Sequence, residues 1–189
     1  TDHNTIVLFT SDHGELLGDH CHWHKIVPYE PAARIPLLIS TPQRFELGAG
    51  SVVDTAVCLE DIMPTLLDMA GVDIPDTVEG SSLLPAMRGG PAPDREYLHI
   101  QHAPLHHCLT DGREKYIWFV VDGREQFFDL TQDPKECHDL SANPASRERM
   151  AHWRSLLVEK LKQRPEGFSD GQRLIPGREF GPTLPHAGT

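Results

Sequence analysis

The sequence predicts an α/β fold in which a small antiparallel sheet and a long helix occupy the second half. Two short apolar runs, at residues 6–9 and 36–40, are rich in Ile, Val and Leu, as buried strands are. Further short strands with Asp-Gly turns between them follow, and then an amphipathic helix at residues 147–161. With 189 residues, of which 39% are hydrophobic, the chain is long enough to form a packed core.

The first apolar run, IVLF at residues 6–9, is continuous, which is typical of a parallel-type strand that is buried on both faces. Polar residues follow at its C-terminal end, the edge at which open α/β sheets bind ligands. The run PLLIS at residues 36–40 predicts a second strand of the same kind. Two such strands do not make a stable covered sheet. We therefore expect an oligomer or a longer protein to supply their neighbours.

Two helical segments are expected in the first half. Residues 29–34 have room for one or two turns of helix. In residues 59–70, apolar side chains follow helical spacing, and Gly71 is suited to a left-handed C-cap. Pro64 fits this pattern best in the first turn, which places the start of the helix within residues 59–63.

After a Gly-, Pro- and Ser-rich loop at residues 79–93, the pattern changes to short strands. These strands are expected at residues 97–101, 108–110, 115–121 and 126–130. The helix at 147–161 carries one apolar stripe, formed by Met150, Trp153, Leu156, Leu157 and Leu161. Beyond it we expect an extended or disordered tail. The chain should therefore consist of three parts, at residues 1–93, 94–163 and 164–189.

The formal net charge of −11 and the pI near 5.4 argue against nucleic acid or an anionic membrane as the main partner. No apolar run approaches the ~20 residues of a membrane span. No signal peptide is visible at residues 1–4. The cysteines are far apart and form no CxxC pair, which argues against a zinc ribbon or a redox motif. We expect buried free thiols, with one disulfide as the alternative, at Cys21, Cys58, Cys108 and Cys137.

Residues 10–25, TSDHGELLGDHCHWHK, hold an unusual density of charged and metal-ligand side chains. Asp12 and His13 stand where the first strand ends, and their oxygen and nitrogen ligands suit Ca²⁺, Mn²⁺ or Zn²⁺. As an isolated pair they are as readily a cap or a turn. Lys25 offers a point charge to an anionic oxygen, although a single lysine is more often a solvated surface residue.

Other polar residues have simpler interpretations. Glu30 and Arg34 are four positions apart, so an intrahelical ion pair is the ordinary interpretation. The pair His106-His107 is interpreted as structural. Three alternating histidines could share one face and bind a metal, but an exposed loop is the more ordinary interpretation, and contact of one of them with a substrate is the main alternative; they are His20, His22 and His24.

Residues 4–40, NTIVLFTSDHGELLGDHCHWHKIVPYEPAARIPLLIS, strongly resemble the second conserved block of the sulfatase family, within the alkaline-phosphatase-like superfamily. The match includes spacing as well as residue types. Residues 111–141, DGREKYIWFVVDGREQFFDLTQDPKECHDLS, are similar to the C-terminal subdomain of sulfatases. The resemblance covers nearly the whole chain. It implies the C-terminal part of an alkaline-phosphatase-like αβα sandwich, followed by a small antiparallel sheet packed with a C-terminal helix.

The resemblance also implies roles for particular residues. Asp12 and His13 match the family's ligands of a divalent cation, Ca²⁺ in the first place and Mn²⁺ or Zn²⁺ as alternatives. Lys25 matches the lysine that contacts the sulfate and the leaving-group oxygen, which makes it the catalytic and substrate-binding candidate. His24 lies in the loop beside the sulfate and is a further substrate-binding candidate. Glu30 and Arg34 match a structural pair behind the site.

The nucleophile of the family is missing from this pattern. Sulfatases use a formylglycine made from Cys or Ser in a C/S-x-P/A-x-R motif near the N-terminus. The four cysteine contexts here, CHWHK, CLEDI, CLTDG and CHDLS, do not fit it. The resemblance therefore implies the C-terminal portion of a sulfatase, without most of the α/β domain. Such a portion should be inactive by itself.

Two other functions stay open at this point. A phosphonate or phosphate ester hydrolase of the same superfamily shares the cation site, and a non-catalytic binding module could retain the fold. The expected partner is a small-molecule or saccharide sulfate ester, and the incomplete sheet could also cause self-association. The compartment, cytoplasm or periplasm, cannot be read from these residues.

Overall fold

The computed structural model describes residues 4–48, 50–102 and 105–178. Contacts between residues divide the chain into two compact units. The first unit contains Thr1–Asp12 and Ile35–Leu98, and the second contains His13–Arg34 and His99–Thr189. This grouping places the loop after Asp12 with the second half of the chain, across the linear boundary at residue 93. The division into three sequential parts stays a prediction.

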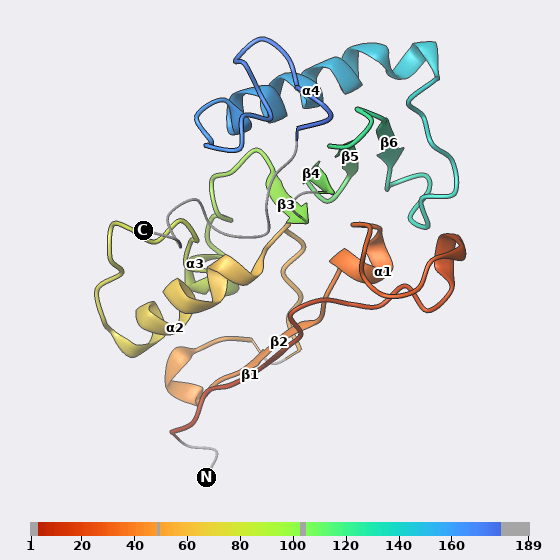
Figure 1. Cartoon of the computed structure of the whole chain (residues 1–189). Helices are drawn as coiled ribbons and strands as arrows, with labels where there is room; N and C mark the ends of the chain where they lie inside the picture. Colours follow the sequence, from red (N-terminus) through yellow and green to blue (C-terminus); the bar gives the residue numbers. More distant parts are fainter. Residues whose placement is uncertain (1–3, 49, 103–104, 179–189) are drawn as a thin grey trace. The chain divides into compact units, whose positions relative to one another are not determined.

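The first unit is built on a two-stranded ribbon with helix α2 beside it (Figure 1). Strands β1 (Val7–Thr10) and β2 (Leu37–Ser40) pair antiparallel. Short helices η2 (Gln43–Phe45) and η3 (Leu59–Asp61) precede α2 (Ile62–Ala70), and α3 (Leu84–Met87) follows. The start of α2 confirms the prediction that Pro64 lies in its first turn. Gly71 has φ 68° and forms the expected left-handed C-cap.

The expectation that both apolar strands are buried on both faces in a parallel sheet is wrong for the described residues. β1 and β2 pair with each other, and antiparallel. One face of the ribbon packs on a small core of Phe45, Met69 and Leu84, together with Ile6 and Ile39. The other face leaves its side chains exposed, at 57% for Val7, 61% for Phe9 and 59% for Leu38. A lone ribbon has one covering layer, so alternate side chains stay uncovered.

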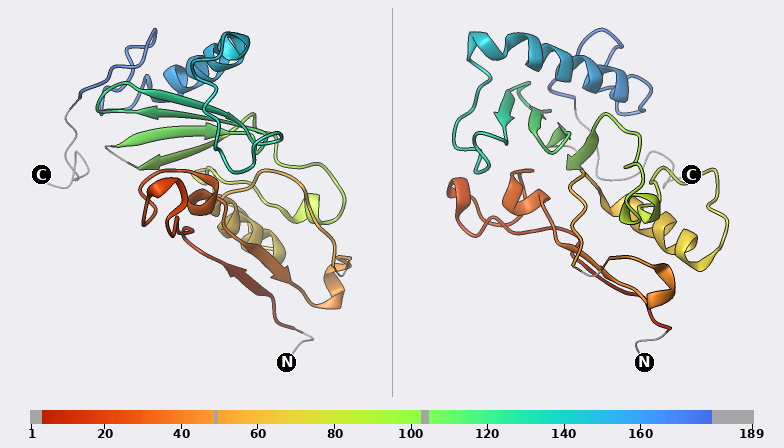
Figure 2. Two further views of the ribbon diagram at one scale, coloured as in Figure 1. Left: turned by 90° about the vertical axis from the view of Figure 1, so that its right-hand side faces the viewer. Right: turned by 180° about the vertical axis from the view of Figure 1, so that it is seen from behind.

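The second unit is a sheet covered on both faces, as the two views of Figure 2 show. Its strands lie in the order β3 (Leu98–His102), β4 (His106–Thr110), β5 (Glu114–Phe119) and β6 (Glu125–Asp129). The pairs β4–β5 and β5–β6 are antiparallel, which confirms the predicted sheet. The loop of residues 13–34, with η1 (Asp19–Cys21) and α1 (Glu30–Ala33), covers one face. Helix α4 (Arg147–Leu161) covers the other.

Helix α4 has the bounds that the sequence predicts, and the short helix η4 (Pro144–Ser146) precedes it. Of the predicted stripe, Leu156 is only half-buried, while Val158 is buried instead. After α4 the chain folds back: Phe168 is fully buried, and the Gly177 N–H donates to the Val120 carbonyl at 2.8 Å. The part of the expected tail at residues 179–189 lies outside the described residues.

All four cysteines carry free thiols, as expected. Burial was correctly predicted for Cys108 alone, because Cys58 is half-buried and Cys21 and Cys137 are exposed. Among the described residues, no helix combines the length and the apolar character that crossing a membrane requires.

Candidate functional site

The sequence-predicted site residues lie on both sides of the boundary between the units. Asp12 is exposed and belongs to the first unit, two residues after β1. His13, His24 and Lys25 belong to the loop of residues 13–34 in the second unit. His24 and Lys25 are exposed, and His13 is half-buried. Each residue is therefore described within its own unit.

The His13 ring is oriented by the backbone beside it. Its Nδ1 lies 2.7 Å from the Gly14 carbonyl oxygen, which can only accept, so Nδ1 carries the proton and donates. In this tautomer Nε2 is the ring nitrogen that carries the lone pair. Backbone carbonyls that fix the tautomer in this way are common partners of metal-binding histidines.

Gly14 is required by a close approach of two backbone segments. Its N–H donates to the Ala32 carbonyl at 2.8 Å, and a Cβ at this position would lie 2.0 Å from the Pro31 carbonyl oxygen. A side chain here would push the segment away from α1. The glycine of the TSDHG motif thus ties His13 to helix α1.

The middle of the loop is held in an uncommon backbone conformation. Four residues that are not glycine have positive φ, at 49° for Leu17, 53° for His20, 61° for Cys21 and 66° for His24. Non-glycine residues rarely adopt this region, and they persist there only when the surrounding structure fixes them. One such contact is visible: the His20 ring stacks on Tyr29, and its Nε2 donates to the Lys135 carbonyl at 3.0 Å.

The backbone on both sides of Lys25 is hydrogen-bonded within the second unit. The Leu16 N–H donates to the His24 carbonyl at 3.0 Å. Nε2 of His106, from strand β4, donates to the Ile26 carbonyl at 2.9 Å. The ammonium of Lys25 thus extends from a fixed backbone into solvent, where it could meet an anionic ligand.

Glu30 pairs more closely with Lys115 than with Arg34. Their side chains approach to 4.0 Å, and that of Arg34 is 80% exposed. Glu30 Oε1 instead accepts from Lys115 Nζ at 2.9 Å. The partner that matters for Glu30 therefore comes from strand β5.

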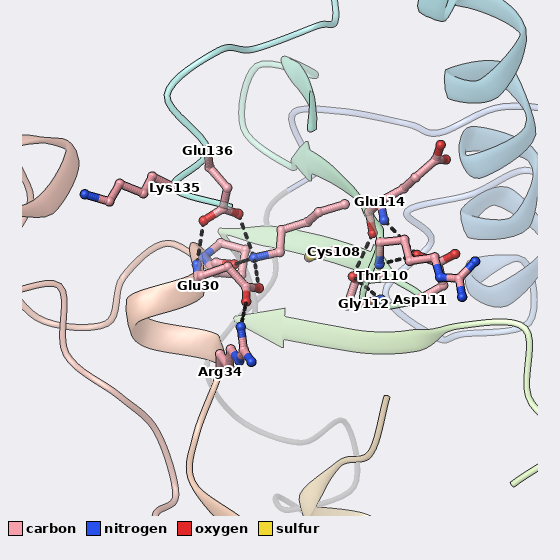
Figure 3. Close-up of polar contacts among 12 residues, drawn as sticks. Glu30, Arg34, Cys108, Thr110, Asp111, Gly112, Glu114, Lys135 and Glu136 are labelled. Atoms are coloured by element: carbon pink, nitrogen blue, oxygen red, sulfur yellow. Dashed lines mark hydrogen bonds and ion pairs between the residues drawn. The ribbon is translucent and has the colours of Figure 1, made fainter. Parts of the chain in front are cut away.

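Lys115 is the centre of a buried ionic cluster that the sequence interpretation missed. Its side chain has no exposed surface, and Nζ donates to the Pro28 carbonyl at 2.9 Å and contacts Glu136 Oε1 at 2.6 Å. Glu136 is also buried, and its Oε2 accepts from the Glu30 N–H at 2.6 Å. Figure 3 shows the Glu136 carboxylate, from the loop after β6, pointing toward Glu30 of α1.

The charges of this cluster influence one another. Burial by itself lowers the pKa of Lys115, but Cys108, Glu136 and Glu30 raise it more, so that it lies above its usual value and the ammonium is retained. Burial raises the pKa of Glu136, and Lys115 opposes part of that rise. The sequence signal that could have revealed this cluster is the lysine at an inward-facing position of the apolar strand EKYIWF.

The histidines of β4 have structural surroundings, in line with their interpretation from the sequence. His106 lies on the face toward the loop, and burial lowers its pKa to about 4. His107 lies on the opposite face, against Trp118 and Phe168, and burial lowers its pKa to about 3. Its Nδ1 lies 3.0 Å from Nε2 of His99, whose pKa burial likewise lowers to about 4.

The described residues contain no group of three or more His, Cys, Asp or Glu side chains that could hold a metal ion. Asp12 and His13 are two adjacent ligands, fewer than a complete coordination shell needs. The pair of one carboxylate and one imidazole fits a divalent cation chemically.

The serine form of the nucleophile motif, Ser-x-Pro-x-Arg, occurs at residues 40–44. A comparison of the four cysteine contexts with the motif does not detect it. Ser40 pairs with Val7 in the ribbon. Val7 lies three residues, or ~10 Å along the strand, from Thr10, the end of β1 that leads to Asp12. Arg44 donates to Asn4 Oδ1 at 2.7 Å and stacks on Phe45. These residues are used structurally, and we do not assign Ser40 as the nucleophile.

Residues 18–164 match the model of the family described as N-sulphoglucosamine sulphohydrolase, C-terminal. The chain belongs to this sulfatase family. The alkaline-phosphatase-like superfamily, which the TSDHG block and the small sheet indicated, is thereby confirmed. The matched segment includes Lys25, the ionic cluster and helix α4.

Known proteins with similar sequences and structures agree. The chain is 42% identical over 178 residues to an arylsulfatase of Clostridium perfringens, covering 92% of this chain and 37% of that protein. A solved protein in complex with its substrate D-glucosamine-2-N,6-O-disulfate is 31% identical, with a TM-score of 0.74, and the match covers 84% of this chain and 34% of that one. The phosphonate monoester hydrolase of Agrobacterium radiobacter is 26% identical, with a TM-score of 0.69, over 84% of this chain and 35% of that one.

The sulfatase chain thus spans little more than a third of the length of these proteins. Its mixed α/β architecture, with small antiparallel sheets and a C-terminal helix, matches the solved sulfatases. The activity of the whole protein is a separate matter.

Proposed function

We propose that the whole protein, meaning the full native gene product, is a metal-dependent sulfuric ester hydrolase that acts on a small-molecule or saccharide sulfate ester. The observation that carries the proposal is the sulfatase family match over residues 18–164. The arylsulfatase relative and the structural neighbour bound to a glucosamine disulfate support a sulfated substrate.

In this proposal each candidate residue has one role. Asp12 and His13 hold the divalent cation, with Ca²⁺ as the first choice and Mn²⁺ or Zn²⁺ as alternatives. The cation, when bound, offsets negative charge that develops on the sulfate oxygens. Lys25 binds the sulfate and donates to the leaving-group oxygen, His24 contacts the substrate, and Glu30 with Arg34 supports the loop from behind.

The nucleophile in this proposal comes from outside residues 1–189. We expect the 189-residue chain to be inactive by itself, because its described residues hold at most part of the cation shell and no formylglycine precursor at the site.

A phosphonate or phosphate ester hydrolase is the second candidate, because a phosphonate monoester hydrolase shares the architecture. It would share the cation site and differ in its nucleophile and outer contacts. A non-catalytic binding module is the third, and it predicts binding of a sulfated ligand without turnover.

The test is an initial-rate assay of the whole protein on 4-nitrocatechol sulfate and on a phenyl phosphonate ester, with and without added Ca²⁺. We expect faster turnover of the sulfate and a loss of about a hundredfold or more in Asp12→Ala. Asp76→Ala, which removes another exposed carboxylate, is the matched control and should keep the wild-type rate. Preference for the phosphonate would favour the second candidate, and no turnover of either ester would contradict the proposal.

A further inference from the structure

The loop of residues 13–34 carries three of the candidate site residues, yet it has little regular structure of its own. Only η1 and the four-residue helix α1 interrupt it, and four of its residues that are not glycine have positive φ. Such a loop does not hold a reactive geometry by local preference alone. The contacts that fix it must come from the rest of the second unit.

Those contacts come from one face of the β4–β6 sheet. Alternation along a strand places Lys115 and Ile117 on the face toward the loop, and Tyr116 on the face toward α4. From the loop face, His106 donates to the Ile26 carbonyl and Gln126 accepts from the Tyr29 hydroxyl. An apolar layer, which includes Leu16, Val27, Tyr29, Cys108, Ile117 and Phe128, fills the space between.

Lys115 is the most demanding of these contacts. The Lys115 ammonium lies against three acceptors: it donates to the Pro28 carbonyl and to Glu30 Oε1, and it forms an ion pair with Glu136 Oε1 at 2.6 Å. Two of these acceptors belong to the loop. The third, Glu136, accepts the first N–H of α1 through its other oxygen. One buried cation thus joins the sheet, the loop and the segment after β6.

Glu136 itself is held in a conformation that requires support. It has φ 55° and is buried, although glutamate ordinarily avoids both conditions. Buried ion pairs of this kind contribute little to net stability, because desolvation offsets their attraction. The cluster therefore has a stronger rationale as a device that fixes geometry than as a source of stability.

We propose that Lys115 is a positioning residue, which holds Pro28 and Glu30 and thereby fixes His13 and Lys25 for the sulfate-ester reaction. The link to His13 runs through α1, because the Gly14 N–H and the Glu15 N–H donate to the Ala32 and Pro31 carbonyls. Lys25 lies three residues before Pro28 in the same segment, so holding the Pro28 carbonyl restrains the chain that carries Lys25. The catalytic consequence rests on the proposed function, whereas the fixation of the loop does not.

The test compares two variants of the whole protein. Lys115→Met leaves two carboxylates without their cation, so it should both destabilise the protein and loosen the loop. In Lys115→Met/Glu136→Gln one of those charges is gone, so the melting temperature should return close to the wild-type value. If Lys115 positions the loop, the loop should stay loose in both variants.

Hydrogen exchange and kinetics provide the readouts. In the double variant we expect the amides of Glu15, Leu16 and Ala32 to exchange about tenfold faster or more, while the β4–β5 amides keep their protection. We also expect kcat on 4-nitrocatechol sulfate to fall about tenfold or more, with KM changed little. Arg154→Met, which breaks an ion pair with Glu125 on the α4 side, is the matched control and should leave the loop amides unchanged.

The outcomes separate the two proposals. Recovery of loop protection and kcat together with the melting temperature would overturn the positioning role. Unchanged loop exchange in both variants would overturn it as well. If the wild-type protein hydrolyses no sulfate ester, the proposed function fails, and the exchange data still decide whether Lys115 fixes the loop.

Discussion

The β1–β2 ribbon and the strands β4–β6 of the larger sheet are both antiparallel, but they are covered differently. The sheet has the loop of residues 13–34 on one face and α4 on the other. The ribbon has a core on one face only, and Val7, Phe9 and Leu38 stay exposed on the other. Hence the second unit supplies its own packing, whereas the first unit presents an apolar face of the kind that other protein surface usually covers.

The largest expected effect compares a phenylalanine from each region. Phe128→Ala in the sheet should cost about 3–5 kcal/mol of unfolding free energy, because Phe128 is buried in the layer under the loop. Phe9→Ala should cost within about 0.5 kcal/mol in the 189-residue chain, since its ring is mostly exposed. Urea denaturation followed by circular dichroism measures both. The same Phe9→Ala change in the whole protein should cost several times more, and equal small costs would show that nothing covers the ribbon.

The second prediction concerns the loss of unfolding free energy at low pH, which should arise in the sheet of the second unit. The folded pKa of His106 is about 4, below its ordinary value near 6.5, so the unfolded state binds the proton first. Its contribution is present above pH 6.5 and is lost as the pH falls toward 4, by about 3 kcal/mol. His99 and His107 act in the same direction, and Glu136, whose pKa is raised, acts against them.

Unfolding free energies at pH 7 and pH 4 measure this loss. His106→Gln should flatten the pH dependence by removing one of the three histidines. A pH dependence as steep as that of the wild type would show that His106 does not titrate in this way.

The third prediction uses the exposed face of the ribbon. If this face causes the 189-residue chain to self-associate, Phe9→Lys/Leu38→Lys should weaken the association and reduce ANS fluorescence, because both side chains are exposed there. Light scattering coupled to size exclusion measures the mass. Val121→Lys, at an exposed apolar position of the second unit, is the control. If Val121→Lys weakened the association as much as Phe9→Lys/Leu38→Lys does, the exposed face of the ribbon would not be its cause.

The smallest effect is expected for Arg34. Arg34→Ala should change the unfolding free energy by about 0.5 kcal/mol or less, because its pair with Glu30 is long and exposed. Thermal melting of the whole protein measures it. A loss as large as that of Lys115→Met would mean that the intrahelical pair, and not the buried cluster, supports α1.

Much of the fold followed from local sequence signals. The bounds of α4, the cap at Gly71 and the strands around the Asp-Gly turns were all predicted, because periodicity and turn residues act over a few positions. The exposure of one face of β1 was not predicted, because a continuous apolar run does not reveal whether another surface covers it.

The candidate site followed from the sequence only in part. The TSDHG block and Lys25 were recognised from their spacing in a family pattern. The contacts of Lys115 with Pro28, Glu30 and Glu136 join segments far apart in the chain, so no local pattern reveals them. For the same reason Glu30 was paired with Arg34, its neighbour in sequence, and not with Lys115.

In the proposed function, the loop held by the sheet presents Lys25 to a sulfate ester. This role is tested by kcat/KM of the whole protein on 4-nitrocatechol sulfate for Lys25→Ala and for Lys162→Ala. Lys162 is an exposed lysine that directly follows helix α4, and it serves as the control. We expect a loss of about a hundredfold or more for Lys25→Ala and a wild-type value for Lys162→Ala. A Lys25→Ala variant that hydrolyses the ester as fast as the wild type would contradict it.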